Sequence, residues 1–277
     1  MPPVSFKKII GTIGGNDQLL WIALIFLIQQ IGNGVVLGGL GSTYLYFDLG
    51  YQGGYYSNFS TFGLAATAVL MVLYPAISRK INRKPLMGVM IVTAAVGYVV
   101  MFVIGAFMPS SSPSLKCWLM TAGYMLANFG QYSFYLIMMI SILNTVEYNE
   151  LTRGERDEAI IASLRPFLTK LASALISVIT YVCYIVFGVL NYTNEISELE
   201  RLTSMGELSE MAKLGEIADV ITKVQPGQKF GLLVCITLVP FIFMFVSYVL
   251  YKKHYKLDEG EYDRICRELA ARKVTEA

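Results

Sequence analysis

The chain has 277 residues, of which 55% are hydrophobic and only 15% charged, and its formal net charge is +2. A soluble domain carries about a quarter charged residues. Residues 19–47 contain no charged side chain, and roughly 20 apolar residues suffice to cross a bilayer as a helix, so we exclude a soluble globular domain. We expect a lipid bilayer around this chain and no nucleic-acid partner.

Apolar segments recur along the chain with the length of membrane spans. Because backbone groups in lipid must be hydrogen-bonded internally, and because these segments lack the alternation of barrel strands, we predict helices. The predicted fold is an all-α membrane protein with a cytoplasmic lead-in (1–18), a transmembrane bundle (19–251) and a cytoplasmic tail (252–277). The predicted spans are residues 19–47, 55–78, 86–108, 117–143, 159–190 and 230–251.

Basic residues predict the orientation, because short loops rich in Lys and Arg stay in the cytoplasm. Residues 79–84 carry four basic side chains, whereas the segment after the first span carries none and the segment after the third span carries only Lys116. We therefore expect both termini and residues 144–158 on the cytoplasmic side of a bacterial inner membrane.

The first span contains three amide side chains, Gln29, Gln30 and Asn33, among several glycines. These amides are candidates to line a polar path through the membrane. The alternative is hydrogen bonding between helices, which is common for such residues. The glycines indicate close helix packing or bending rather than phosphate binding.

The fourth span carries Asn128, Gln131 and Tyr135, which recur at i, i+3 and i+7 and so share one helix face. Amides that bond to hydroxyls, beside a flat ring that covers C–H groups, suit a sugar. Interhelical hydrogen bonding is again the open alternative.

The cytoplasmic segment 144–158 is dense in both signs of charge. A solvated loop explains such a composition. The alternative is a gate whose ion pairs form in one conformation and break in the other. The candidate gate residues are Glu147, Tyr148, Glu150, Arg156, Glu158 and Arg165.

Arg165 and Lys170 are the only charged side chains inside the predicted spans. A cation in hydrocarbon is costly and usually lines a polar path with a partner, yet no predicted span holds Asp or Glu. Counted from Ala159, Lys170 lies about 15 Å along its helix. Alternatively, residues 171–190 span alone and Lys170 extends to the cytoplasmic interface. Arg165 is expected to reach that interface or to pair with a loop acid.

Two segments outside the spans predict short helices. Residues 191–229 are acidic and weakly amphipathic, which indicates one or two surface helices, with a substrate lid as the alternative. In the tail, Asp258 followed by Glu261 fits a capping box. An apolar stripe follows it at helical spacing and predicts an amphipathic helix against the cytoplasmic face. The stripe is Tyr262, Ile265, Cys266 and Leu269.

The segment NTVEYNELTRGERDEAIIASLRPFLTKLASAL resembles the signature of glycoside–pentoside–hexuronide:cation symporters, the melibiose permease family. The family pattern is approximately D-x-x-D-Y-x-E, an Arg-x-Glu pair, and then a helix carrying a Lys. Glu147 stands at the second acidic position, and the matching residues after it are Tyr148, Glu150, Arg156 and Glu158. The basic segment RKINRK and the tail KKHYKLDEGEYDRICREL are similar to the family as well.

This resemblance implies the C-terminal half of a major-facilitator transporter, a three-plus-three inverted repeat. Lys170 falls on the family's helix lysine, near the sugar and cation sites, and Tyr135 falls where the melibiose permease has a sugar-site tryptophan. Asn144 replaces the first acid of the pattern, which weakens a gate ion pair. In this family the coupling cation, Na⁺ or H⁺, is bound mainly by six N-terminal helices, a half that is missing here and expected as a partner.

The leading hypothesis is therefore one half of a secondary active symporter for a sugar or glycoside. The alternative is a non-transporting six-helix membrane subunit or a truncated transporter remnant. A membrane enzyme is disfavoured, because no predicted span holds a His or an acid that would act as a general base or bind a metal. We expect no metal site and no cofactor besides the coupling cation.

Overall fold

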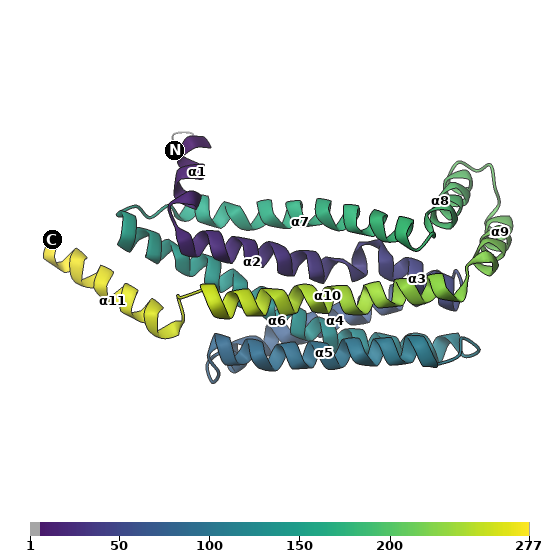
Figure 1. Cartoon of the computed structure of the whole chain (residues 1–277), viewed down its shortest axis with the longest axis horizontal. Coiled ribbons are helices and arrows are strands. Elements are labelled where there is room, and N and C mark those ends of the chain that lie inside the picture. The colour runs from purple at the N-terminus through teal and green to yellow at the C-terminus, as the bar shows by residue number, and fades with distance from the viewer. Residues whose placement is uncertain (1–5, 277) are drawn as a thin grey trace.

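The computed structural model of the chain describes residues 6–276, in which every regular element is a helix (Figure 1). Within this range, six helical segments are long and apolar enough to cross a membrane, which confirms the predicted all-α, six-span fold. The first is Asp17–Leu49, which joins α2 (Asp17–Gly34), η1 (Val36–Leu40) and α3 (Gly41–Leu49). The others are α4 (Gly53–Ser78), α5 (Arg83–Phe107), α6 (Pro113–Arg153), α7 (Glu158–Val186) and α10 (Pro226–His254).

The largest departure from the predicted spans is α6, which continues to Arg153 instead of ending near residue 143. No Pro or Gly interrupts residues 131–153, so nothing in the sequence stops the helix earlier. It ends at Gly154, whose φ of 74° is the left-handed C-cap conformation that glycine favours. The predicted gate segment is therefore helical up to Arg153, and only residues 154–157 connect it to α7.

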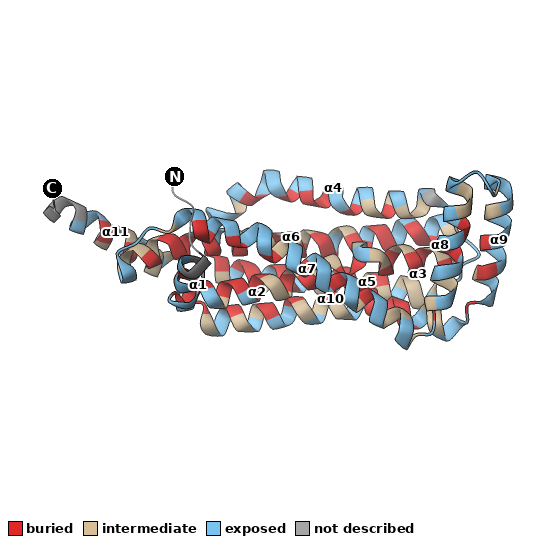
Figure 2. Cartoon of the chain, turned by 90° about the horizontal axis from the view of Figure 1, so that it is seen from above, coloured by how far each residue is buried: buried red, intermediate tan, exposed pale blue. Residues whose placement is uncertain are grey.

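Helices α2, α6 and α10 form the centre of the bundle, and α4, α5 and α7 pack around them (Figures 1 and 2). Between 44% and 56% of the apolar stretch of each central helix is buried, against 28% for α4 and 33% for α5. The least buried span is α7, at 17%. Of the six spans, α7 is consequently the one that the rest of the bundle covers least.

The α5–α6 contact depends on small residues. A Cβ atom at Gly97 would lie 2.3 Å from the Ala127 nitrogen, and one at Gly130 would lie 2.6 Å from the Met90 carbonyl oxygen. Glycine at such crossings allows helix backbones in a membrane to approach closely. This contact fixes α6, which carries most of the candidate site residues, against its neighbour.

The first span is broken at Gly38 and Gly39. Gly39 has φ 121°, a conformation that other residues rarely adopt, and the helix changes direction there. The break confirms the prediction that the glycines of this span allow bending. Gly38 and Gly39 also let α7 pack close, because a Cβ at Gly38 would lie 2.5 Å from Ile176.

Short helices occupy the two ends of the bundle (Figure 1). At the end away from the termini, the prediction of one or two surface helices is confirmed, since two are present, α8 (Leu190–Ser204) and α9 (Glu210–Lys223). At the other end, α11 (Glu259–Glu276) confirms the tail helix, since the Glu261 N–H donates to Asp258 Oδ1 (3.1 Å) and Ile265 is fully buried. In the lead-in, α1 (Phe6–Gly14) is a helix that the sequence did not predict, and residues 1–5 lie outside the described range.

Candidate functional site

Gln131 of α6 holds four helices together and does not face open space. It is buried, its amide nitrogen donates to the Tyr98 hydroxyl (3.1 Å) and the Pro240 carbonyl (3.3 Å), and its side-chain oxygen accepts from Gln29 (3.3 Å). These partners come from α5, α10 and α2. The geometry is that of interhelical hydrogen bonding, the alternative considered for this residue.

Asn128 and Tyr135 point to other neighbours. Asn128 is buried and its side chain donates to the Gly63 carbonyl of α4 (2.8 Å), whereas Tyr135 lies half-buried between α2 and α7. The predicted common face of Asn128, Gln131 and Tyr135 is therefore corrected: the crossing of α4, α5 and α10 over α6 covers the first two, and only Tyr135 is left near a surface.

Tyr135 belongs to a group of side chains that we call the central cluster: Asn33, Tyr132, Tyr135 and Arg165. The Tyr135 hydroxyl accepts a short hydrogen bond from Arg165, whose guanidinium carbon lies 5.5 Å from the ring centre. The Tyr132 ring meets the Tyr135 ring edge-on at 6.0 Å, and its hydroxyl is directed to the Asn33 side chain. Arg165 thus pairs with a tyrosine of α6, and its predicted place among the gate residues is corrected.

Gln30 lies one turn before Asn33 on α2. Its side-chain oxygen is buried, and no donor among the described residues reaches it. An unsatisfied buried acceptor costs about 1–3 kcal/mol. A ligand hydroxyl or a cation at this oxygen would remove that cost, so the position fits the predicted polar path.

Lys170 lies near the middle of α7. It is the 13th of 29 residues, so its Cα is about 18 Å from the start of a helix about 43 Å long. Gln30 is 13 residues into α2, which starts at the same end of the bundle, so the two residues lie at similar depth (Figure 1). The folded length of α7 therefore favours the bilayer centre over the interface for Lys170.

Lys170 lies on an uncovered surface of α7 and is followed there by two further polar side chains. Lys170 is exposed and has no hydrogen bond or ion pair with any described residue. Ser173 and Ser177 follow at i+3 and i+7 and are exposed as well, so the three side chains share a face of α7. Polar side chains in a membrane span normally face a protein interior or a water-filled cavity. We call Lys170, Ser173 and Ser177 the α7 polar face.

The spans also contain acids that the predicted boundaries had left out. Asp48 of α3 and Lys116 of α6 form a buried pair with 2.7 Å between Oδ2 and Nζ, at the bundle end that carries α8. Lys116 is only 2% exposed. Each residue lies one position outside a predicted span. The pair leaves Lys170 as the cation without a partner among the described residues of the span interiors.

Arg156 forms ion pairs with the three acids of the predicted gate. Its guanidinium lies 2.9 Å from Glu147, 2.8 Å from Glu150 and 3.4 Å from Glu158. The hydrogen bond that Arg156 donates to Glu150, and then the charge of Glu147, raise the pKa of Arg156 above its ordinary value. The predicted residues do meet, and Tyr148 stands apart because its hydroxyl donates to Asp17 (2.8 Å).

Asn144 stands where the family pattern has an acid. It contacts Arg83, which already forms an ion pair with Glu259. With its amide oriented to satisfy both groups, Asn144 accepts from the Arg83 guanidinium at 2.7 and 3.2 Å and donates to the Ile140 carbonyl. Glu259 of α11 accepts from the Arg83 guanidinium (3.0 Å) and backbone N–H (2.7 Å). The tail helix thus supplies the acid that position 144 lacks.

Sequence reasoning missed Tyr132, Arg83 and Glu259 as site residues. The signal for Tyr132 was present, since it lies three residues before Tyr135 on the same helix. The contact between Arg83 and Glu259 joins positions 176 residues apart, and no local pattern reports it.

The assembled site combines amides, hydroxyls, flat rings and one unpaired cation, on helices long enough to cross a membrane. Residues 2–259 match the family described as MFS/sugar transport protein. The chain belongs to this family. This match and the sugar transporters named below confirm the family resemblance that was predicted from residues 144–175.

Curated relatives of this MFS/sugar transport protein are similar over part of their length. The chain is 27% identical over 172 residues to the raffinose carrier protein of Pediococcus pentosaceus, covering 62% of this chain and 25% of that protein. It is 31% identical over 171 residues to the lactose permease of Lactobacillus delbrueckii subsp. bulgaricus, covering 62% and 26%. The lactose permease of Leuconostoc lactis is 29% identical over 173 residues. The chain spans about a quarter of the length of these relatives.

Proposed function

We propose that the chain is one six-helix half of a secondary active sugar:cation symporter and that the α7 polar face borders its substrate path. The observation that carries this proposal is Lys170, an exposed and unpaired cation near the middle of a span. Facing hydrocarbon, such a residue costs about 2.5–3.5 kcal/mol on insertion scales. A second six-helix bundle that encloses a polar path against α7 removes this cost.

The residues at the path would divide between sugar and cation. The Tyr135 ring offers a flat surface for a sugar, and Gln30 and Asn33 offer hydrogen-bonding groups. Lys170 would pair with carboxylates of the second bundle, which would bind the coupling cation, Na⁺ or H⁺. The names of the relatives support a sugar as substrate and a transporter rather than an enzyme.

The ion pairs of Arg156 with Glu147 and Glu150 would act as part of a cytoplasmic gate. These groups are partly exposed at the end of the bundle that carries both described ends of the chain (Figure 1). Rigid-body movement of one bundle against the other would make or break the contacts around them. In this account the termini lie in the cytoplasm and the protein resides in a bacterial inner membrane.

The orientation has a direct test in intact cells. Ser111 and Asn82 are exposed residues at opposite ends of α5. A cysteine at Ser111 should be labelled by an impermeant thiol reagent from outside, and a cysteine at Asn82 only after the cells are opened. Equal labelling of both in intact cells contradicts the orientation.

Uptake measurements test the function. Co-expression of this chain with the six N-terminal helices of a family member should give accumulation of a radiolabelled galactoside, and the purified chain alone should give none. Failure to accumulate sugar with any partner half would favour the non-transporting subunit or the remnant. Coupled uptake by the purified monomeric chain would refute the half-transporter proposal.

A further inference from the structure

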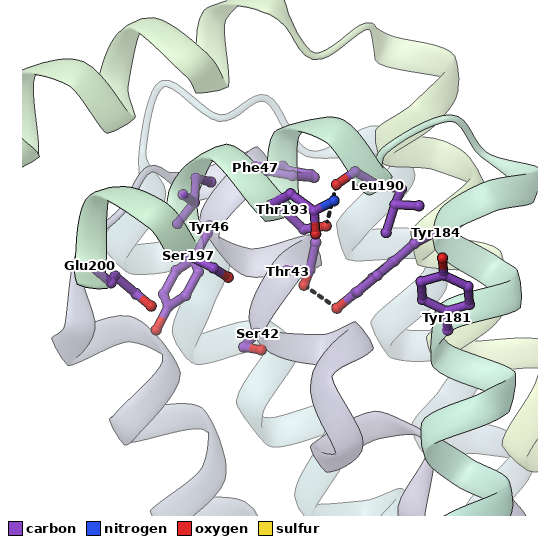
Figure 3. Close-up of a pocket in the computed structure, with 12 residues that line it drawn as sticks. Ser42, Thr43, Tyr46, Phe47, Tyr181, Tyr184, Leu190, Thr193, Ser197 and Glu200 are labelled. Carbon is purple, nitrogen blue, oxygen red and sulfur yellow. Dashed lines mark hydrogen bonds between the residues drawn. The ribbon is translucent and has the colours of Figure 1, made fainter. Parts of the chain in front are cut away.

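A cavity of about 290 Å³ lies between α3, α7 and α8, at the end of the bundle away from the termini (Figures 1 and 3). It is separate from the central cluster and the α7 polar face. Pockets that bind small molecules start at about 300 Å³, so its volume suits a single sugar ring.

Side chains of three helices line the cavity. From α8 come Thr193, Ser197 and Glu200, which recur at i, i+4 and i+7 on one helix face (Figure 3). Opposite them, Tyr46 of α3 and Tyr181 of α7 supply aromatic rings. A ring surface facing hydroxyl and carboxylate groups combines the two contacts that a sugar needs, one for C–H faces and one for hydroxyls.

The floor of the cavity is fixed by the break in the first span. The hydroxyls of Thr43 and Tyr184 lie 2.6 Å apart, and both lie within hydrogen-bond distance of the Gly39 carbonyl, at 3.0 and 3.2 Å. Since each hydroxyl has one proton, one of them donates to the carbonyl and the other donates either to the carbonyl or to its neighbour. This carbonyl is available because the backbone leaves the helical conformation at Gly39. The hydroxyl groups on the floor of the cavity are therefore already hydrogen-bonded and need no ligand to hold their positions.

On the α8 side of the cavity, in contrast, two polar side chains have no hydrogen-bond partner among the described residues. Asn194 and Ser197 are exposed to the cavity, and neither side chain bonds to another described residue. A ligand that meets them replaces only water, whereas a ligand at the floor would have to break existing bonds. We therefore place the polar contacts of the ligand on α8.

Charge narrows the class of ligand. Glu200 is the one charged residue among those that line the cavity, and it accepts a hydrogen bond from Tyr51 (2.5 Å). Burial, together with this bond to Glu200, raises the pKa of Tyr51, as expected beside an ionised carboxylate. An anionic ligand would be repelled by Glu200 and would find no lysine or arginine in the lining.

The geometry points to a second saccharide site in this cavity, which binds one neutral sugar ring between the tyrosines of α3 and α7 and the polar face of α8, and which disfavours uronates. This proposal depends on the proposed function in one respect, the choice of a sugar as the class of ligand. Binding at this site needs neither a second bundle nor transport.

Saturation-transfer NMR on the whole chain in detergent-free nanodiscs tests the site, since glycosidic detergents would compete for it. The probes are lactose and galacturonate at pH 7. We expect saturation of lactose by the wild type and weaker binding of galacturonate. The Asn194→Leu/Ser197→Leu double variant should lose lactose affinity by about tenfold, as expected if hydrogen bonds contribute roughly 1.4 kcal/mol.

Two sets of controls separate the possible outcomes. Asn191→Leu/Ser204→Leu makes the same changes on α8 outside the lining and should bind lactose like the wild type, and Glu200→Gln should strengthen galacturonate binding. Unchanged binding in the Asn194/Ser197 variant, or loss of lactose binding only in Tyr135→Ala, overturns this site. If the cavity variants behave as expected while uptake with every partner half fails, only the proposed transport function falls.

Discussion

Helices α6 and α7 both carry strongly polar side chains through the membrane, but Gln131 of α6 is hydrogen-bonded by the described residues and Lys170 of α7 is not. Gln131 of α6 has partners on three other helices, whereas Lys170 of α7 has none. Residue type therefore does not separate a structural polar group from a functional one in a span. What separates them is whether the fold completes the hydrogen bonds, and each prediction below tests that criterion.

The largest effect is expected at Lys170. In the complete transporter, Lys170→Ala and Lys170→Arg should both reduce concentrative sugar uptake to background while membrane expression stays normal, because a planar, bulkier guanidinium does not replace an ammonium at a close charge pair. Arg165→Lys is the control and should retain uptake. Accumulation at the wild-type level by Lys170→Arg would show that this residue only extends to the interface.

Gln131 should behave in the opposite way. Gln131→Leu should lower the free energy of unfolding by about 1–2 kcal/mol, the upper range for interhelical hydrogen bonds in membranes, because the Pro240 carbonyl and the Tyr98 hydroxyl lose the bonds that the Gln131 amide donates. Unfolding in mixed micelles measures this, with the sugar dissociation constant as a second readout. A large loss of sugar affinity with unchanged stability would move Gln131 to the substrate path.

The Arg83–Asn144–Glu259 contact predicts a rescue. Glu259→Gln should cost about 1 kcal/mol, as for a partly exposed ion pair, and should speed hydrogen exchange in α11. Adding Asn144→Asp should restore the bundle stability by returning a carboxylate to Arg83, while α11 continues to exchange fast. A double variant no more stable than Glu259→Gln alone would contradict the exchange of partners.

The same contact predicts a dependence on pH. Burial opposes ionisation of Glu259, but hydrogen bonds from the Arg83 N–H and guanidinium hold its pKa below 4.5. A lowered pKa gives stability that is complete above the unfolded value and is lost as the pH falls through the folded value. The protection of α11 amides from hydrogen exchange, relative to the unfolded chain at the same pH, should therefore be constant as the pH falls to 4.5 and should decrease only below it. A decrease in protection between pH 7 and pH 5 would contradict this pairing.

The smallest effect is expected at Arg156. Arg156 itself is nearly half exposed, although Glu147 and Glu150 are mostly covered, so Arg156→Ala should change the unfolding free energy by about 1 kcal/mol or less, and less still at high salt. Uptake kinetics should change more than stability if these pairs form in one conformation of a gate. Unaltered uptake kinetics would show that these ion pairs are a solvated surface network and not part of a gate.

The spans were predictable from the sequence because hydrocarbon imposes one simple requirement, a long run without charges, and each observed span covers or nearly covers its prediction. The helical continuation of α6 to Arg153 was not predictable from charge, because a helix does not end where the membrane does. The partners of Asn128 and Gln131 were not predictable either. Spacing along α6 places side chains on a face, but only the packing of α4, α5 and α10 decides what covers that face.

The most direct test of the central claim asks whether the α7 polar face meets water or lipid. Ser173 and Val96 are both exposed and both lie near the middle of a span, on α7 and α5. Each is changed to cysteine in a complete transporter without its other cysteines and treated with a water-soluble maleimide. We predict that Ser173→Cys is labelled, that sugar slows the labelling, and that Val96→Cys is inert. If Ser173→Cys is as unreactive as Val96→Cys, the face meets lipid and no substrate path runs along α7.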